Sequence, residues 1–105
     1  MIYDSLWINN RMERYTDTIS GEELYLDRAS GNKRYYKDRG MTIRHRLDGP
    51  AFEWVSGHKE WWVDGKRHRL DGPAVEWADG YKAWWVNGVS IMWTSKKGMI
   101  IERMK

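Results

Sequence analysis

Two consecutive stretches decide the fold: HRLDGPAFEWVSGHKEWWVDGKR at residues 45–67 and HRLDGPAVEWADGYKAWWVNGVS at residues 68–90. Aligned at an offset of 23 residues, they are identical at 15 of 23 positions, which chance does not produce. A fixed period of this length is typical of arrays in which each repeat is one supersecondary unit stacked on the next. The sequence therefore predicts a repeat protein.

The repeat continues upstream in less regular form. Two segments match the second half of the unit: SGNKRYYKD at 30–38, aligned with SGHKEWWVD at 56–64, and YDSLWINN at 3–10, aligned with YKAWWVNG at 81–88. We therefore divide the chain, expected to be one domain over 1–105, into degenerate units at 3–44, clear units at 45–67 and 68–90, and a C-terminal cap at 91–105.

Each unit predicts a β-hairpin. Two segments rich in strand-forming residues, AVEW and YKAWWV, flank the pair Asp79-Gly80, and Ser56-Gly57 stands at the same place one unit earlier. Asp-Gly favours a two-residue type I′ turn, because both central residues of that turn need positive φ. No helix signal interrupts this pattern, so the predicted fold class is all-β, an antiparallel sheet of successive hairpins.

The two-residue turn also predicts which side chains share a face. It sets Trp54 opposite Lys59 and Phe52 opposite Trp61, with the lysine over an aromatic ring. In the next unit the same turn sets Trp77 opposite Lys82 and Val75 opposite Trp84. We expect this face to be the core. A register slip of one residue would exchange the two faces and swap Trp61 with Trp62.

The opposite face supplies the candidate protein-binding residues. The predicted register places Trp62, Trp85 and Tyr81 there, with Glu53 and Glu60 facing each other beside them. Exposed aromatic rings of this kind suit a protein hot spot. The alternative is that the terminal segments cover both tryptophans.

The repeat resembles a known family. The order aromatic, Trp, any residue, Asn or Asp, Gly, Lys, any residue, His is similar to the MORN repeat (membrane occupation and recognition nexus), closely over 45–88 and loosely over 3–44. The resemblance implies a single curved sheet of MORN-like hairpins with atypical terminal caps. It also implies protein contacts, dimerisation or lipid association rather than enzymatic activity.

One departure from the family refines this resemblance. His45-Arg46 and His68-Arg69, each followed by LDGPA, stand where MORN units typically have His-Gly. This variant is similar to one found in small proteins of tailed bacteriophages. The resemblance then implies a phage-encoded protein in the host cytoplasm that binds a host protein, as an inhibitor of a bacterial defence or host factor.

The composition excludes several other classes. The 105 residues include eight Trp and six Tyr but no Cys, so disulfides, thiolate nucleophiles and Cys-based zinc sites are excluded. No apolar run reaches the roughly 18 residues of a membrane helix, and the N-terminus lacks a signal-peptide layout. We therefore expect a cytoplasmic protein without a membrane span, with a core built mainly from Trp and Tyr.

The basic residues suggest a second function. Residues 28–46 carry seven basic groups against one acidic group, although the whole chain has a net charge of only +3. The recurring turns predict a cationic rim of Arg44, Arg46, Lys66, Arg67 and Arg69. Such a rim can bind an anionic ligand, such as a nucleotide signal, nucleic acid or a phospholipid head group. The alternative, which we rank higher, is that each arginine pairs with Asp48, Asp64 or Asp71 in the adjoining unit, or is simply solvated in the turn.

Catalytic and metal chemistry receive little support. His45 with Asp48 and His68 with Asp71 recur identically, which indicates an architectural use rather than a metal site. The paired carboxylates Glu53 and Glu60 lack a counterpart in the next unit. We therefore expect a non-enzymatic protein without metal or cofactor, and we prefer a homodimer joined at unpaired sheet edges, which no proline guards.

Overall fold

The computed structural model of the chain describes residues 12–94 and 100–102. Within these residues the structure is all-β apart from one 3-10 turn, η1, at Ala29–Gly31. The strands are β1 (Met12–Thr16), β2 (Glu23–Asp27), β3 (Lys33–Tyr36), β4 (Phe52–Glu53), β5 (Lys59–Glu60), β6 (Trp62–Val63), β7 (Lys66–Arg67), β8 (Val75–Glu76), β9 (Lys82–Val86), β10 (Val89–Thr94) and β11 (Ile100–Glu102).

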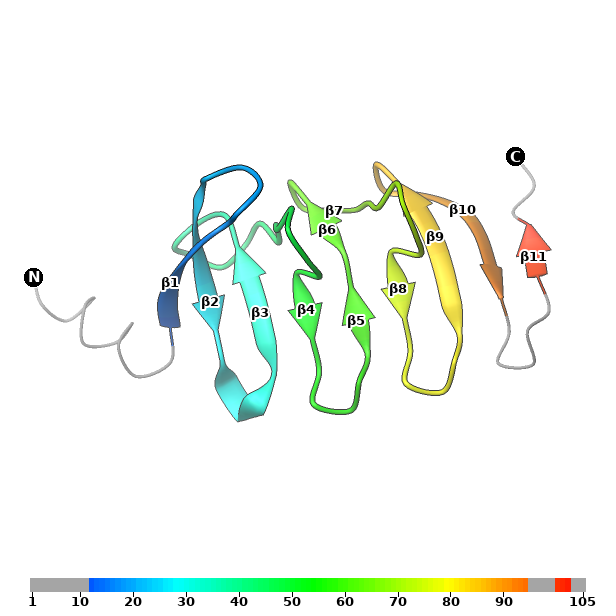
Figure 1. Cartoon of the computed structure of the whole chain (residues 1–105), viewed down its shortest axis with the longest axis horizontal. Coiled ribbons are helices and arrows are strands. Elements are labelled where there is room, and N and C mark those ends of the chain that lie inside the picture. Colours follow the sequence, from blue (N-terminus) through cyan, green and yellow to red (C-terminus); the bar gives the residue numbers. More distant parts are fainter. Residues whose placement is uncertain (1–11, 95–99, 103–105) are drawn as a thin grey trace, which may run out of the picture.

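Nine of these strands form one antiparallel sheet in the order β1-β2-β3-β4-β5-β8-β9-β10-β11. They stand side by side along the long axis of the molecule, while β6 and β7 pair separately at one end of the strands (Figure 1). The sheet is open, with β1 and β11 at its edges. The predicted all-β class and antiparallel hairpins are therefore confirmed. The segment at 3–10 lies outside the described residues.

The predicted register within the hairpins is wrong by one residue. Glu53, not Trp54, lies opposite Lys59, and Phe52 lies opposite Glu60. The reason is the turn: Gly57 has a φ of 104°, but Ser56 does not have the positive φ that a type I′ turn needs. The hairpin instead closes with a three-residue loop that has glycine in its last position. The second hairpin has the same register, with Glu76 opposite Lys82.

The backbone bonds of the loop show this directly. Trp54 donates its N–H to the His58 carbonyl at 2.9 Å, and Gly57 donates to the Trp54 carbonyl at 2.9 Å. Trp77 and Gly80 make the equivalent bonds one unit later, at 2.8 and 3.0 Å. The two clear repeats therefore share one hairpin geometry.

The change of register reassigns the two faces of the sheet, because side chains alternate with a period of two. The front face, as we call it, carries Phe52, Trp54, His58, Glu60, Trp62, Val75, Trp77, Tyr81, Ala83 and Trp85. The back face carries Tyr15, Tyr35, Arg46, Glu53, Trp61 and Arg69. Trp62 thus lies on the face first expected to be the core, and Trp61 on the other.

The hydrophobic core is thin and is shared between the faces. On β2 and β3, Leu24, Leu26 and Tyr35 form a buried cluster against which Tyr15 packs. Further along the sheet the buried apolar residues are Ala51, Phe52, Ala74, Val75 and Ala83. Phe52 is the one aromatic residue of this group, and no tryptophan of the described residues is buried. The expected core of mainly Trp and Tyr is therefore found only for the tyrosines, Tyr35 and Tyr36.

The less regular unit before residue 45 keeps the backbone pattern of the clear units. Tyr35 and Trp61 each donate an N–H to the alanine carbonyl that ends the next LDGPA motif, at 2.7 Å in both cases. Each also accepts an N–H from the next repeat histidine, at 3.1 Å in both cases. The Tyr pair therefore occupies the structural position of the Trp pair.

Candidate functional site

A continuous row of aromatic rings runs across the front face. Neighbouring rings meet edge to face, with centroids 4.4–6.2 Å apart, in the order Tyr36, Phe52, Trp54, His58, Trp77 and Tyr81. The row crosses from the first clear hairpin to the second at His58, whose ring lies 4.4 Å from both Trp54 and Trp77. Edge-to-face contacts of this kind stabilise by about 0.5–1.5 kcal/mol each beyond burial.

A cleft of about 670 Å³ opens beside this row, between the tips of the two hairpins. Its lining consists of Trp54, Ser56, His58, Glu60, Arg67, Trp77, Ala78 and Asp79. The Trp77 side of the cleft is accessible, because this residue is 50% exposed. A half-exposed indole beside a largely apolar hollow is the kind of feature that marks a binding site.

The inner part of the cleft is polar. Glu60, only 8% exposed, contacts the His58 Nε2 at 3.0 Å and accepts the Trp62 indole N–H at 2.7 Å. The guanidinium of Arg67 lies 3.7 Å from the same carboxylate. Two buried atoms here, His58 Nδ1 and Arg67 Nε, have no hydrogen-bond partner. A buried unpaired polar atom costs about 1–3 kcal/mol, so the two such atoms found here among the described residues need an explanation.

These polar residues are the ones that break the repeat. The two clear units differ at eight of 23 positions, and six of the eight residues that line the cleft stand at such positions. Tyr81, Ala83 and Ser90 replace the histidine, glutamate and arginine in the second unit. The fold accounts for the residues that the two units share. The residues that differ between the units gather in one cleft, which indicates that the cleft has a role of its own.

Trp62 and Trp85, the predicted binding pair, belong instead to a stack of arginines and aromatic rings. Arg44 lies over the rings of Phe52 and Trp62, at 4.5 and 4.8 Å. Arg67 lies over Trp62 and Trp85, at 5.0 and 5.1 Å. Both indoles are half-buried in this stack. The exposed indole of the front face is Trp77, which the wrong register had assigned to the core.

The other two predicted rim arginines are held on the back face. Arg46 stacks on Tyr35 at 4.1 Å and donates to Asp48 at 2.6 Å and to the Pro50 carbonyl at 3.0 Å. Arg69 stacks on Trp61 at 3.8 Å and donates to Asp71 at 3.1 Å. The arginine–aspartate pairs that the sequence predicts between adjoining units therefore form within each unit.

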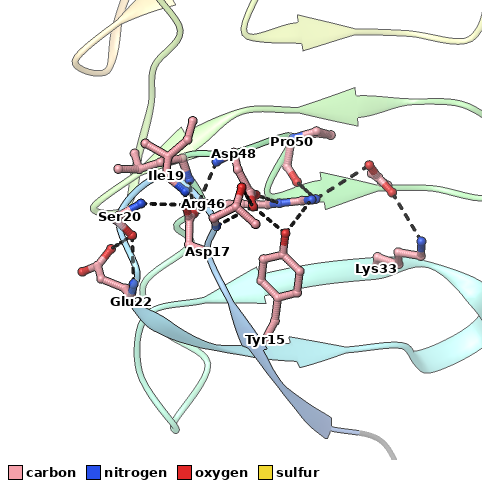
Figure 2. A network of polar contacts seen from close by, with 12 residues as sticks. Tyr15, Asp17, Ile19, Ser20, Glu22, Lys33, Arg46, Asp48 and Pro50 are labelled. Atoms are coloured by element: carbon pink, nitrogen blue, oxygen red, sulfur yellow. Dashed lines mark hydrogen bonds and ion pairs between the residues drawn. The ribbon is translucent and has the colours of Figure 1, made fainter.

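Asp48 is the centre of a denser network than its repeat partner (Figure 2). Its carboxylate accepts the Tyr15 hydroxyl at 2.5 Å and both the backbone N–H and the hydroxyl of Thr18 at 2.8 Å. Burial alone would raise the pKa of the Asp48 carboxyl, but the hydrogen bonds from Thr18, Tyr15 and Arg46 outweigh it and hold that pKa well below its usual range. The network ties the first LDGPA loop to β1 and the loop that follows it.

The remaining predicted site residues do not assemble with the cleft. Glu53 lies on the back face, 3.9 Å from both Lys33 and Arg46, and so does not face Glu60 as predicted. Lys66 is exposed on β7, and its side chain lies against Gly88. Tyr81 ends the aromatic row.

The repeated histidines serve the turns. His45 Nδ1 accepts the Asp64 backbone N–H at 2.9 Å, and His68 Nδ1 accepts the Asn87 N–H at 3.0 Å. Each histidine thereby fixes the turn of its own unit. In residues 12–94 and 100–102, no three His, Asp or Glu side chains gather as a metal ion would require, and no helix is long and apolar enough to cross a membrane.

Alanine substitutions should show how much each of the two histidines contributes to the free energy of unfolding. His45 is 3% exposed and also contacts Glu22 through Nε2 at 2.8 Å, whereas His68 is half-buried. We expect His45→Ala to lower the free energy of unfolding by about 2–3 kcal/mol and His68→Ala by about 1 kcal/mol. Urea denaturation measures both, and a larger loss at His68 would contradict the assignment.

Comparisons of the chain with protein-family models, with curated proteins and with solved structures returned no match. The site's chemistry must therefore be argued from its own residues.

Proposed function

We propose that the chain is a non-enzymatic binding module that recognises a protein partner through the cleft and the aromatic row of its front face. The observation that carries this proposal is Trp77, a large indole left 50% exposed beside the cleft. Protein hot spots are enriched in Trp, Tyr and Arg, which are the residues gathered here.

The arrangement of charged groups favours this function over the alternative of anion capture. Arg44 and Arg67 are sandwiched between rings, and Arg46 and Arg69 are bonded to carboxylates and carbonyls of their own units. An anion at Arg46 or Arg69 would have to displace these carboxylates and carbonyls, and an anion at Arg67 would meet the Glu60 carboxylate 3.7 Å away. Acid–base catalysis by Glu53 and Glu60 is also disfavoured, because the two carboxylates lie on opposite faces of the sheet.

The proposed architecture is a curved sheet of MORN-like repeats in one domain with atypical caps. The 23-residue period, the hairpin in each unit and the open sheet edge support it. The HRLDGPA variant, by its resemblance to phage sequences, extends the proposal to a host protein as partner, such as a bacterial defence or host factor in the cytoplasm. In this proposal the unpaired edge strands of the sheet also join two copies of the chain in a homodimer, in addition to the contact with the partner protein.

Affinity capture tests the proposal. The tagged full chain is incubated with bacterial lysate, washed at low salt and at about 0.5 M salt, and the eluate is examined for proteins by mass spectrometry and for nucleotides by chromatography. We expect one stoichiometric protein that survives the salt wash, because contacts of aromatic rings are screened little by ions. A phosphate-bearing ligand that the salt removes would contradict the proposal in favour of anion binding.

A further inference from the structure

Arginine side chains stack on several aromatic rings of this protein. Seven rings have a guanidinium carbon 3.8–5.7 Å from their centroid: Tyr15, Tyr25, Tyr35, Phe52, Trp61, Trp62 and Trp85. The face of an aromatic ring carries partial negative charge, so it attracts the guanidinium group that packs on it. The fold therefore uses stacked guanidinium groups as a repeated means of packing.

Trp54 and Trp77, the two indoles of the cleft, have no such contact among the described residues, and neither have Tyr36, Tyr81, Trp84 and Trp93. Within residues 12–94, no Arg or Lys is placed over either ring, although both lie in the row of edge-to-face contacts. Trp77 keeps half of its surface open to solvent. The cleft thus offers exposed indole surface that no cation of the described residues covers.

The charges around the cleft favour a cation. Glu60 is balanced by Arg67 at 3.7 Å. Asp79, at the tip of the second hairpin, accepts only the Tyr81 backbone N–H, at 3.1 Å, and has no ion-pair partner among the described residues. The charges of Glu60, Arg67 and Asp79 in the lining therefore sum to one net negative charge. An anionic group would meet two carboxylates in the same hollow.

We propose that the cleft receives an arginine side chain of the partner protein, stacked on the indoles of Trp54 and Trp77 and paired with Asp79. This inference rests on the proposed function and names what the partner presents. Arginine fits better than lysine, because its planar guanidinium both stacks on a ring and donates in parallel to a carboxylate. The nine contacts over these seven rings among the described residues use arginine in every case.

The test uses the uniformly 15N-labelled full chain and N-acetyl-arginine amide as the probe. The indole N–H signals of Trp54 and Trp77 are assigned from single Trp→Phe variants. We expect saturable shifts confined to these two signals. N-acetyl-citrulline amide, which has the same shape without the charge, should bind at least about fivefold more weakly.

Asp79→Ser is the matched variant, because serine occupies the same position of the first hairpin at Ser56 and can still accept the Tyr81 N–H. It should preserve the fold and weaken binding of the arginine probe about threefold. Equal shifts with the citrulline probe, equal movement of the other indole signals, or no shift at about 100 mM probe would each overturn the inference.

The outcomes separate this inference from the proposed function. A captured protein partner whose binding needs Trp77, together with no response to the arginine probe, would overturn the inference and leave the binding module standing. Selective binding of the probe without any captured protein would overturn the binding module and leave the arginine site.

Discussion

Asp48→Ala is expected to lower the free energy of unfolding by about 3–5 kcal/mol, because it leaves Arg46 nearly buried without its carboxylate. The Asp48 and Arg46 side chains are 7% and 13% exposed, and their closest atoms are 2.6 Å apart. The substitution also removes the acceptor for the Tyr15 hydroxyl and for two groups of Thr18. Urea denaturation followed by far-UV circular dichroism measures the loss.

The repeat provides a control within the same chain. Asp71 stands at the equivalent position of the next unit and pairs with Arg69 at 3.1 Å, but its side chain is 88% exposed. An exposed ion pair contributes about 0–1 kcal/mol, so Asp71→Ala should lower the free energy of unfolding by no more than that. Equal losses at the two positions would contradict the role assigned to the Asp48 network.

The Asp48 network also determines in which direction the free energy of unfolding changes with pH. A carboxyl whose pKa is lowered by folding stabilises the protein above its unfolded pKa of about 3.9, and that contribution is lost as the pH falls through the folded pKa. The free energy of unfolding of the wild type should therefore fall between about pH 5 and pH 2. The Asp48→Ala variant should show a shallower fall.

The period and the hairpins could be predicted from the sequence because they depend on local signals. The 23-residue offset is visible by direct alignment, and glycine at 57 and 80 marks the turns. The register could not be predicted in the same way. Asp-Gly fits a two-residue turn and also a three-residue loop with glycine in its last position, and the choice depends on whether Asp79 adopts positive φ.

The candidate site was only partly predictable for the same reason. The sequence groups Glu60 and Tyr81 with Trp62 on one face, as the structure does, but it predicts Trp77 in the core and Trp62 on an open surface. Arg44 and Arg67 stack on the same ring, Trp62, although they are 23 residues apart in the sequence, which no local pattern indicates. One signal was present in the sequence: the positions at which the two clear units differ include most of the cleft.

Trp77→Ala is expected to weaken binding of the captured partner about 30-fold or more, which corresponds to a hot-spot loss of about 2 kcal/mol. The effect should be large because Trp77 is both the exposed anchor of the front face and a wall of the cleft. The fold should remain, since the residue is half exposed and its hairpin is closed by backbone bonds.

Leu70→Ala is the matched control for this variant. Leu70 is the most exposed large apolar residue of the described chain, at 79%, and lies in the loop that carries Arg69 and Asp71 rather than beside the cleft. Its truncation removes exposed apolar surface without touching the front face. It should leave the affinity for the partner within about twofold of the wild type.

The role of Trp77 as the anchor for a protein partner is tested by the dissociation constant of the purified partner for the wild type, Trp77→Ala and Leu70→Ala. Thermal unfolding of each variant checks that it is folded. We expect only Trp77→Ala to lose affinity, with all three proteins folded. Unchanged affinity in a folded Trp77→Ala protein, or an equal loss at Leu70, would contradict it.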